Sequence, residues 1–363
     1  TLNITKVYES ATTLIGQNIL ENGKTMGLAA YGKDKPFKNL FSNHQPDDNL
    51  FLHYMGTEVG YKEYMELQTK KVTKNKTLYA NYAFQVQKQT QEEVLHLIKK
   101  YVTKTKIKNV CLTGGYALNV VTNEFLVKNL PKVNFYFEPL ADDSGNSIGA
   151  AFHMHRSLTK DKTINKLTHT FFNHKKSIIK KKHKKCGIPQ IVDYLLKQKI
   201  VSIYDGQAES GPRSLGHRSI IFDARNKNAK KIINKIKKRE WYRPFACSVL
   251  KEYAKEYFNM YHLSDSPFMT ISFPVLKDKK KIIPGVVHVD GSCRIQTVDN
   301  SVPHLYKLLK EFYKKTNVPV LLNTSFNTAG EPLIESYEDA IKSFQKSDID
   351  VLWFPSKGEI LIK

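Results

Sequence analysis

Apolar residues recur along the chain with two different spacings, which predict where helices and strands lie. Spacings of three and four residues indicate helices with one buried face, whereas short apolar or alternating runs indicate strands. In the first long helix we expect Val94, Leu97, Ile98 and Tyr101 to form one buried stripe. The predicted helices are 78–101, 117–130, one beginning near 148, 189–199, 229–238, 305–315 and 337–347, the last with Ser336 as its N-cap.

Strands are predicted between these helices, and the alternation of the two is typical of an α/β fold. Residues 24–33, KTMGLAAYGK, are predicted to be a glycine-punctuated loop, and the polar stretch 43–76 an insertion. The predicted strands are 110–112, 133–137, 200–204, 268–275, 286–289, 295–298, 318–323, 351–354 and 359–362.

The length of 363 residues favours two domains, because single hydrophobic cores rarely grow so large. The tract KKSIIKKKHKK (175–185) carries charge without helical periodicity and predicts a solvated linker. We therefore expect a first domain over 1–158, a basic linker over 159–187 and a second domain over 188–363.

Composition narrows the class of protein. The chain is 41% hydrophobic, which indicates a globular protein. Nothing at its start resembles a signal peptide, and no run approaches the ~18 apolar residues that a membrane span needs. Its four cysteines include no CxxC pair, so we expect free thiols in a reducing, cytoplasmic compartment. The sequence begins with Thr1, and we expect further residues upstream.

Positive charge is abundant but unevenly distributed by residue type. The formal net charge is +23, yet only seven of the 57 basic residues are arginine. The lysines are widely spread, which predicts attraction for polyanions without specificity and leaves a nucleic-acid partner open but not favoured. Six of the seven arginines lie within one window: Arg213, Arg218, Arg225, Arg239, Arg243 and Arg294.

This window opens with residues 206–223, GQAESGPRSLGHRSIIFD, directly after the predicted strand 200–204. Glycine lets a backbone approach a ligand closely, and arginine grips phosphate or carboxylate with a planar fork. We therefore interpret the arginine window as an anion site in preference to a set of structural ion pairs.

Two further stretches carry candidate chemistry. Gly114 and Gly115 stand between a predicted strand and a predicted helix, where backbone N–H groups can face a phosphate or sugar. Asp142 and Asp143 follow the strand 133–137, and either hold a hard cation or cap the next helix. His153 and His155 are spaced to lie on different helix faces, so no shared metal is expected there.

Seven motifs in order extend over nearly the whole chain and resemble those of one family, the ATP-dependent O-carbamoyltransferases of nodulation-factor and antibiotic tailoring. The motifs are KTMGLAAYG (24–32), LTGGYALN (112–119), PLADDSGNSIGAA (139–151), ESGPRSLGHRSI (209–220), KKREWYRPFA (237–246), VVHVDGSCRIQTV (286–298) and VPVLLNTSFNTAGEP (318–332).

The resemblance implies that the first domain is the C-terminal part of an actin-like, RNase H-like ATPase domain related to the threonylcarbamoyl-tRNA enzyme. In the family this domain binds carbamoyl-adenylate beside an iron-type metal. Asp143 matches the metal-binding aspartate, and Gly114, Gly115 and Asn119 match the adenosine-binding loop. The family's metal site also needs a histidine pair from an HxxxH-type motif, which this sequence lacks.

The second domain is similar to threonylcarbamoyl-adenylate synthase, which implies that it makes an adenylate from Mg²⁺-ATP and carbamoyl phosphate. The residues expected to hold these two anions are Arg213, Arg218, Lys237, Arg239, Arg243, Ser325 and Asn327, of which the pairs Lys237–Arg239 and Ser325–Asn327 match the KxR and SxN signatures.

The intact protein is thus expected to carbamoylate a hydroxyl of a small-molecule or nucleotide acceptor. Two alternatives remain. One is a non-catalytic nucleotide- or nucleic-acid-binding subunit, and the other is a carbamoylating enzyme of nucleic-acid modification. No membrane partner is expected, and the oligomeric state is left open.

Overall fold

The computed structural model describes residues 4–18, 21–34, 76–161, 163, 167–173 and 181–363. These residues fold into two compact units of mixed α/β structure, which confirms the predicted fold class. The first unit takes in Thr1–Cys111 and Gly115–Tyr136, and the second takes in Leu112–Gly114 and Phe137–Lys363. Apart from Lys76, the predicted insertion 43–76 lies outside the described residues. The helices of the described part include none that is both long and apolar enough to cross a bilayer.

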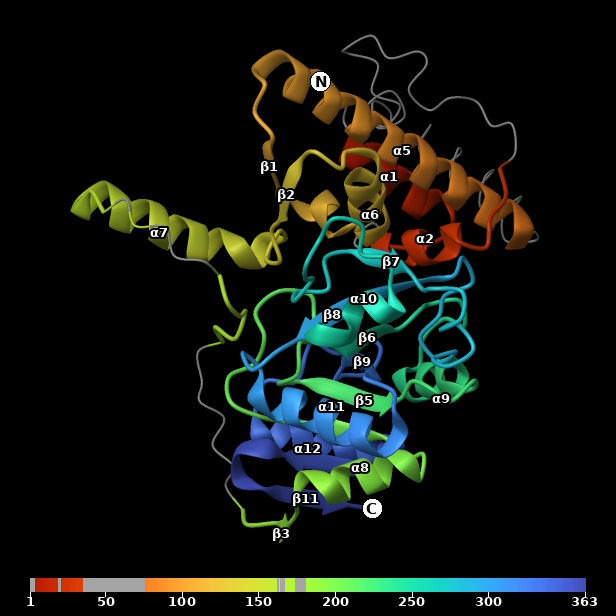
Figure 1. Ribbon diagram of the computed structural model, residues 1–363, viewed down its shortest axis with the longest axis vertical. Helices are drawn as coiled ribbons and strands as arrows, with labels where there is room; N and C mark the ends of the chain where they lie inside the picture. The colour runs from red at the N-terminus through yellow and green to blue at the C-terminus, as the bar shows by residue number, and fades with distance from the viewer. Residues whose placement is uncertain (1–3, 19–20, 35–75, 162, 164–166, 174–180) are drawn as a thin grey trace, which may run out of the picture. The chain divides into compact units, whose positions relative to one another are not determined.

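The first unit is built around α5, the longest helix of the described chain, and its elements are drawn in red to yellow in Figure 1. Helices α1 and α2 both pack against α5, and α6 packs against it further along the chain. The elements are α1 (Ile4–Leu14), α2 (Asn22–Ala29), α5 (Lys76–Thr105), β1 (Asn109–Leu112), the 3₁₀ turn η1 (Gly115–Leu118), α6 (Val120–Asn129) and β2 (Asn134–Phe137), with β1 paired to β2.

Helix α2 corrects the prediction of a loop at 24–33. Its small residues are its buried ones, since Thr25, Gly27 and Ala29 all lie inside the packing with α1 and α5. The Thr25 hydroxyl lies 2.8 Å from that of Thr12 on α1 and forms a hydrogen bond with it. Gly32 follows the helix and meets the backbone of Ala80 so closely that a Cβ there would clash. Glycine here permits close approach, whereas the sequence analysis took it as part of a loop.

The buried stripe of α5 also differs from the prediction. Val94 and Ile98 are buried, but Leu97 is 40% exposed and Tyr101 is 54% exposed. The stripe continues towards the N-terminus through Thr90, whose hydroxyl donates to the main-chain oxygen of Val86 at 2.7 Å. Buried polar residues extend this stripe, and a rule based on apolar spacing does not find them.

The second unit contains a nine-stranded mixed sheet with the order β3-β11-β10-β4-β5-β9-β6-β8-β7. Within it β4 pairs with β10 and β6 with β8 in parallel, and the other neighbours are antiparallel. The strands are β3 (Lys184–Lys185), β4 (Val201–Ile203), β5 (Ser219–Asp223), β6 (Ala246–Leu250), β7 (Ser272–Pro274), β8 (Ser292–Val298), β9 (Val320–Ser325), β10 (Val351–Phe354) and β11 (Glu359–Ile362).

Helices α8 and α11 pack against each other and cover this sheet, α8 over β4 and β5 and α11 over β6 and β9 (Figure 1). Ser336 caps α12 as predicted, since its hydroxyl accepts from Asp339 N at 3.1 Å. The helices are α7 (Asn146–Thr159), α8 (Ile188–Leu196), α9 (Ala229–Lys237), α10 (Ala254–Tyr257), α11 (Pro303–Thr316) and α12 (Tyr337–Lys346), with short 3₁₀ turns η2 (Asp143–Gly145), η3 (Lys251–Tyr253) and η4 (Pro355–Lys357).

Three strand predictions need correction. Residues 286–289 form a turn instead of a strand, closed by His288 N donating to Ser292 O at 2.8 Å. The sequence analysis missed β5 and β6, both of which are buried at every position. Strands buried on both faces lack the alternation of apolar and polar residues. Because β5 and β6 are also only five residues long, a search for alternation does not find them.

Part of the predicted linker joins the second unit's packing. Thr170 O accepts from Ser210 N at 2.7 Å, and β3 (Lys184–Lys185) pairs with β11. Residues 175–180 of the basic tract lie outside the described residues. The four cysteines are free, as predicted, with Cys247 Sγ and Cys293 Sγ 3.6 Å apart in the core.

Candidate anion-binding site

The loop between β4 and β5 carries the first arginines of the window, and a buried glutamate shapes it. Glu209 is 4% exposed, and its Oε1 accepts from the backbone N atoms of Leu215 at 2.6 Å, His217 at 2.9 Å and Arg218 at 3.3 Å. A carboxylate that collects several N–H donors fixes the course of a loop strongly, because charge-assisted hydrogen bonds are the stronger kind.

Gly211 brings this loop against the segment that follows β2. Its φ is +87°, and a Cβ added there would lie 2.7 Å from Leu140 Cδ2. The close approach places Arg213 where the charge of Asp142 acts on it. Burial nevertheless lowers the pKa of Arg213 well below its usual value, and Arg294 and Arg243 lower it further. Arg213 therefore lies in an environment with too little negative charge.

Arg218 directs its guanidinium at main-chain oxygens. Its side chain is fully buried and lies over the Tyr204 ring at 3.9 Å. Its guanidinium donates to the main-chain oxygens of Asp205, His217, Gly206 and Glu335. In this arrangement Arg218 ties the two ends of the loop together, and its guanidinium faces carbonyl oxygens.

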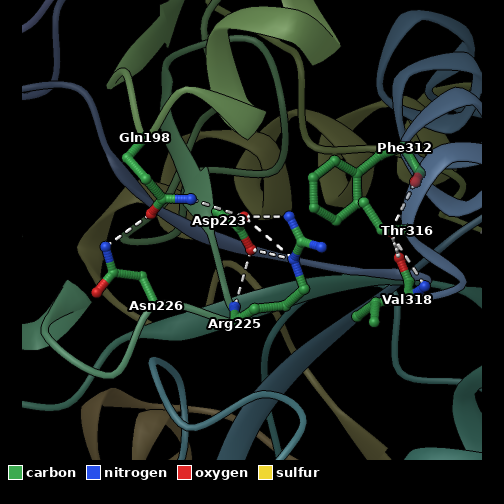
Figure 2. A network of polar contacts seen from close by, with 7 residues as sticks. All are labelled: Gln198, Asp223, Arg225, Asn226, Phe312, Thr316 and Val318. Atoms are coloured by element: carbon green, nitrogen blue, oxygen red, sulfur yellow. Dashed lines mark hydrogen bonds and ion pairs between the residues drawn. The ribbon is translucent and has the colours of Figure 1, made fainter.

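Arg225 corrects the interpretation of the whole window as an anion site. Figure 2 shows its guanidinium against the carboxylate of Asp223, with Arg225 Nη2 2.7 Å and Nε 3.1 Å from Asp223 Oδ2. Asp223 is fully buried and also accepts from Gln198 Nε2 at 3.0 Å. This arginine is half of a structural ion pair at the end of β5.

Lys237 brings together the two signatures that the sequence analysis singled out. Its Nζ lies 2.9 Å from Ser325 Oγ and 2.6 Å from Asn327 Oδ1, and it also donates to Ser325 O. Burial lowers the pKa of Lys237 well below its usual value, and Arg239 and Arg243 lower it further. Phe326 N donates to Arg218 O at 2.8 Å, so the same turn adjoins the end of the arginine loop.

Three more arginines share this environment. Burial lowers the pKa of Arg239 to about 9, helped by Arg243 and Arg294. Burial likewise lowers the pKa of Arg294 to about 10, with Arg243 adding to the effect. Arg243 has a carboxylate at a longer distance, with its Nη1 3.7 Å from Glu240 Oε2. The guanidiniums of Arg239 and Arg294 are thus destabilised in their charged form by burial and by neighbouring cations.

Five cations therefore gather in the second unit, and we call them the cation cluster: Arg213, Lys237, Arg239, Arg243 and Arg294. Like charges in low dielectric repel, and an arriving polyanion relieves that repulsion. The sequence analysis placed Arg294 in the arginine window but not among the site residues. Its signal was the motif HVDGSCR, which ends on this arginine inside β8.

The residues expected to bind adenosine take structural positions in the described chain. Gly114 has a φ of +83°, and Gly115 begins the 3₁₀ turn η1 that precedes α6. Asn119 caps α6 by accepting from Thr122 N at 3.0 Å, and its Nδ2 donates to Gln87 Oε1 at 3.0 Å. The helix therefore begins at Val120, three residues later than the predicted start at 117.

Of the two roles considered for Asp142 and Asp143, the structure shows the capping role, and only for Asp142. Asp142 caps the turn η2 by accepting from Ser144 N at 3.1 Å. Asp143 is exposed and belongs to no group of three potential metal ligands among the described residues. These residues do not by themselves fit the iron-type metal that the resemblance implied, so no chemical step is assigned to that metal here.

Comparison with known proteins adds independent information. The family models described as Carbamoyltransferase N-terminus and Carbamoyltransferase C-terminus match residues 2–152 and 192–358. Nodulation protein NolNO of Sinorhizobium fredii is 32% identical over 98% of this chain and 55% of its own length. Uncharacterized protein MJ1051 of Methanocaldococcus jannaschii is 30% identical over 95% of this chain and 70% of its own length. The chain belongs to the carbamoyltransferase family.

This chain of the carbamoyltransferase family spans only part of the length of several relatives. It covers 55% of NolNO and 66% of nodulation protein NolO of Bradyrhizobium diazoefficiens, to which it is 29% identical. Among solved structures, full-length HypF in its phosphate- and nucleotide-bound form is 18% identical, with a TM-score of 0.33 over 48% of this chain and 24% of that chain. An overlap of that quality is too weak to bear on the site.

Proposed function

We propose that this protein is an ATP-dependent carbamoyltransferase whose second unit makes carbamoyl-adenylate from ATP and carbamoyl phosphate. The observation that carries the proposal is the cation cluster, in which burial and neighbouring cations, Arg243 among them, lower the pKa of the other four members. Membership of the carbamoyltransferase family supports it. Both substrates are dense anions, and ATP brings Mg²⁺ with its phosphates.

The chemistry makes a defined demand on these residues. For atoms to balance, carbamoyl phosphate loses its phosphate to water, and a carbamate oxygen then attacks the α-phosphorus of ATP. The bond from the α-phosphorus to the bridging oxygen breaks, and pyrophosphate leaves with the electron pair. Negative charge therefore grows on the leaving group, where fixed guanidinium and ammonium groups stabilise it without reorganisation.

The cluster's members divide this work by their contacts. Lys237 already donates to Ser325 and Asn327, so it contributes a fixed charge beside the turn that follows β9. Arg213 lies on the glycine-shaped loop and is the member best placed to offer a planar fork to a phosphate. Arg218 acts as a positioning residue, since its guanidinium holds the carbonyl oxygens at the ends of that loop.

The carbamoyl group of the adenylate is then proposed to pass to a hydroxyl of a small-molecule or nucleotide acceptor. The residues that match the family's adenosine-binding loop are Gly114, Gly115 and Asn119, of which Gly115 and Asn119 belong to the first unit. We assign the transfer step to the whole protein and name no acceptor.

Pyrophosphate release from ATP, measured without acceptor, tests the proposal. Release should require carbamoyl phosphate and should fall roughly tenfold to a hundredfold in Arg213→Lys, which keeps the charge but loses the fork. Arg156→Lys is the matched control, because Arg156 lies on the exposed helix α7 and donates only to Thr163 O among the contacts described for it. It should release pyrophosphate at the wild-type rate.

Two results would count against the proposal. If Arg213→Lys is fully active, the cation cluster does not bind through the fork of Arg213. If the folded chain binds ATP but releases no pyrophosphate with carbamoyl phosphate, a nucleotide-binding subunit without catalysis becomes the better description.

A further inference from the structure

A second cluster in the same unit uses none of the five cations. Asp205, His217 and His304 offer ligand atoms that all lie within 4.8 Å of one another, and they form the one such group of three within the described part of the chain. Asp205 follows β4, His217 ends the arginine loop, and His304 lies in the first turn of α11. The side chains of Asp205 and His304 are 13% and 11% exposed.

The hydrogen bonds of the two imidazoles fix which nitrogen of each is available. His217 Nδ1 lies 2.7 Å from Gln207 O, and His304 Nε2 lies 2.8 Å from Gly216 O. A carbonyl oxygen only accepts, so both of these nitrogens carry hydrogen. Nε2 of His217 and Nδ1 of His304 therefore keep their lone pairs when the rings are neutral, which is the state that a metal ion requires.

The surroundings hold all three ligands in place. Asp205 Oδ1 accepts from Ser356 N at 2.9 Å, while its Oδ2 lies 3.5 Å from His304 Nδ1. The ring of Phe171 stacks on His217 with centroids 3.5 Å apart and planes within 2° of each other. An imidazole that donates its second N–H to a carbonyl oxygen, beside an oriented carboxylate, is the usual outer-shell arrangement of a metal-binding histidine.

The local charges favour a cation. Glu209 is buried close enough to act on His217, and its Oε2 has no hydrogen-bond partner. The positive charge that opposes the carboxylates of Asp205 and Glu209 is the guanidinium of Arg218. This group donates to the main-chain oxygens of Asp205 and His217.

We propose that Asp205, His217 and His304 bind a divalent transition-metal ion, and specifically Zn²⁺. Two imidazole nitrogens and one carboxylate oxygen suit zinc better than magnesium or calcium, which take oxygen ligands. The ion links both ends of the loop between β4 and β5 to α11. This link holds Arg213, which lies in that loop, in place. It is a separate site from the metal aspartate of the family resemblance, and the inference does not depend on the proposed carbamoyl-adenylate chemistry.

Zinc binding to the untagged 363-residue chain tests this inference directly. The metal-stripped protein is titrated with Zn²⁺ against a chromogenic chelator, and one ion per chain is expected to bind tightly. Co²⁺ should take the same site and show the visible absorption of nitrogen- and oxygen-ligated cobalt. The thermal unfolding midpoint should rise when either ion is added, because the ion binds only the folded loop.

Three substitutions each remove one ligand atom while they keep the accompanying hydrogen bond. His217→Asn keeps a donor for Gln207 O, His304→Gln keeps a donor for Gly216 O, and Asp205→Asn keeps an acceptor for Ser356 N. Each should weaken Zn²⁺ binding by more than about tenfold, the smaller of the losses seen when even an outer-shell partner is removed. His262→Gln, at an exposed histidine, is the control and should bind zinc as the wild type does.

The three variants give the proposal a clear way to fail. Wild-type affinity in His217→Asn and His304→Gln would place the zinc elsewhere on the chain. A wild-type chain that binds no zinc at micromolar concentration, yet is destabilised by His304→Gln, would make the cluster an ion pair between Asp205 and His304. Should one variant fail to fold, the other two still decide the question.

Discussion

Lys237 is a buried cation whose nearest charged neighbours include Arg239 and Arg243. Its ammonium group is satisfied by oxygen atoms of Ser325 and Asn327, but these are dipoles and do not neutralise it. The protein therefore holds a charge in a place that burial disfavours. Stability given up at such a residue is characteristic of a binding site for the opposite charge.

The depressed pKa of Lys237 predicts how stability depends on pH. Its ordinary value of 10.5 applies to the unfolded chain, and the folded value is well below that. Between the two pKa values the unfolded state binds more protons, so the free energy of unfolding rises with pH. Below the folded pKa, Lys237 is charged in both states, and burial of that charge lowers the free energy of unfolding by its full amount. Lys237→Met should flatten this rise in the pH range below the ordinary lysine value of 10.5.

Thermal unfolding at a series of pH values measures this effect. Lys235→Met, at an exposed position of the same helix α9, should keep the wild-type slope. Lys237→Met should also lose carbamoyl-phosphate-dependent pyrophosphate release. A slope equal to that of the wild type in Lys237→Met would show that the lysine titrates normally and would remove it from the cation cluster.

Arg225 is the opposite case, because its guanidinium is paired with a carboxylate. Arg225→Met would leave the carboxylate of Asp223 fully buried without its counter-charge, and should cost about 3–5 kcal/mol in the free energy of unfolding. Denaturant unfolding measures the loss. Lys315→Met, which breaks an exposed pair with Asp193, should cost less than about 1 kcal/mol. Similar losses in both variants would contradict the ion-pair assignment.

At the scale of elements, the regular helices and strands of the second unit were predictable because their signals are local. The strands β10 and β11 begin and end at the predicted residues, and α11 and α12 begin and end within two residues of the predicted helices. Among the elements that escaped prediction, α2, β5 and β6 depend on contacts with partners far along the chain. Small buried residues in α2 and unbroken burial in β5 and β6 are tertiary properties.

Gly211 predicts how the arginine loop responds when its packing is disturbed. Gly211→Ala places a methyl group 2.7 Å from Leu140 Cδ2 in addition to the strain of its positive φ, so it should cost about 2–4 kcal/mol and weaken ATP binding. Gly16→Ala is matched for backbone strain, with a φ of +79° and open space around the new methyl, and should cost about 1–2 kcal/mol.

Unfolding and ATP titration of the two glycine variants provide the test. If Gly211→Ala loses ATP affinity and Gly16→Ala does not, the contact of this loop with Leu140 is needed for anion binding. Equal behaviour of the two variants would mean that the loop accommodates the methyl group, and that its contact with Leu140 does not position Arg213.

At the scale of the whole molecule, the net charge of +23 comes from lysines that are spread over the sequence. Such a surface should bind any polyanion, including heparin and single-stranded RNA, with an affinity that falls at least tenfold between about 50 mM and about 200 mM salt. Arg213→Lys keeps the net charge and should bind heparin as the wild type does. Salt-resistant RNA binding that Arg213→Lys abolishes would instead favour a nucleic-acid ligand at the cation cluster.

The sequence by itself determined the α/β fold class, most regular elements of the second unit and membership of the carbamoyltransferase family. Periodicity and ordered motifs are local along the chain, so they can be recognised before folding. Only the tertiary structure separated the arginines, because a guanidinium's role depends on what faces it. Asp223 faces Arg225, carbonyl oxygens face Arg218, and other cations surround Arg213 and Arg294. Those partners come from distant elements, which no spacing along the sequence specifies.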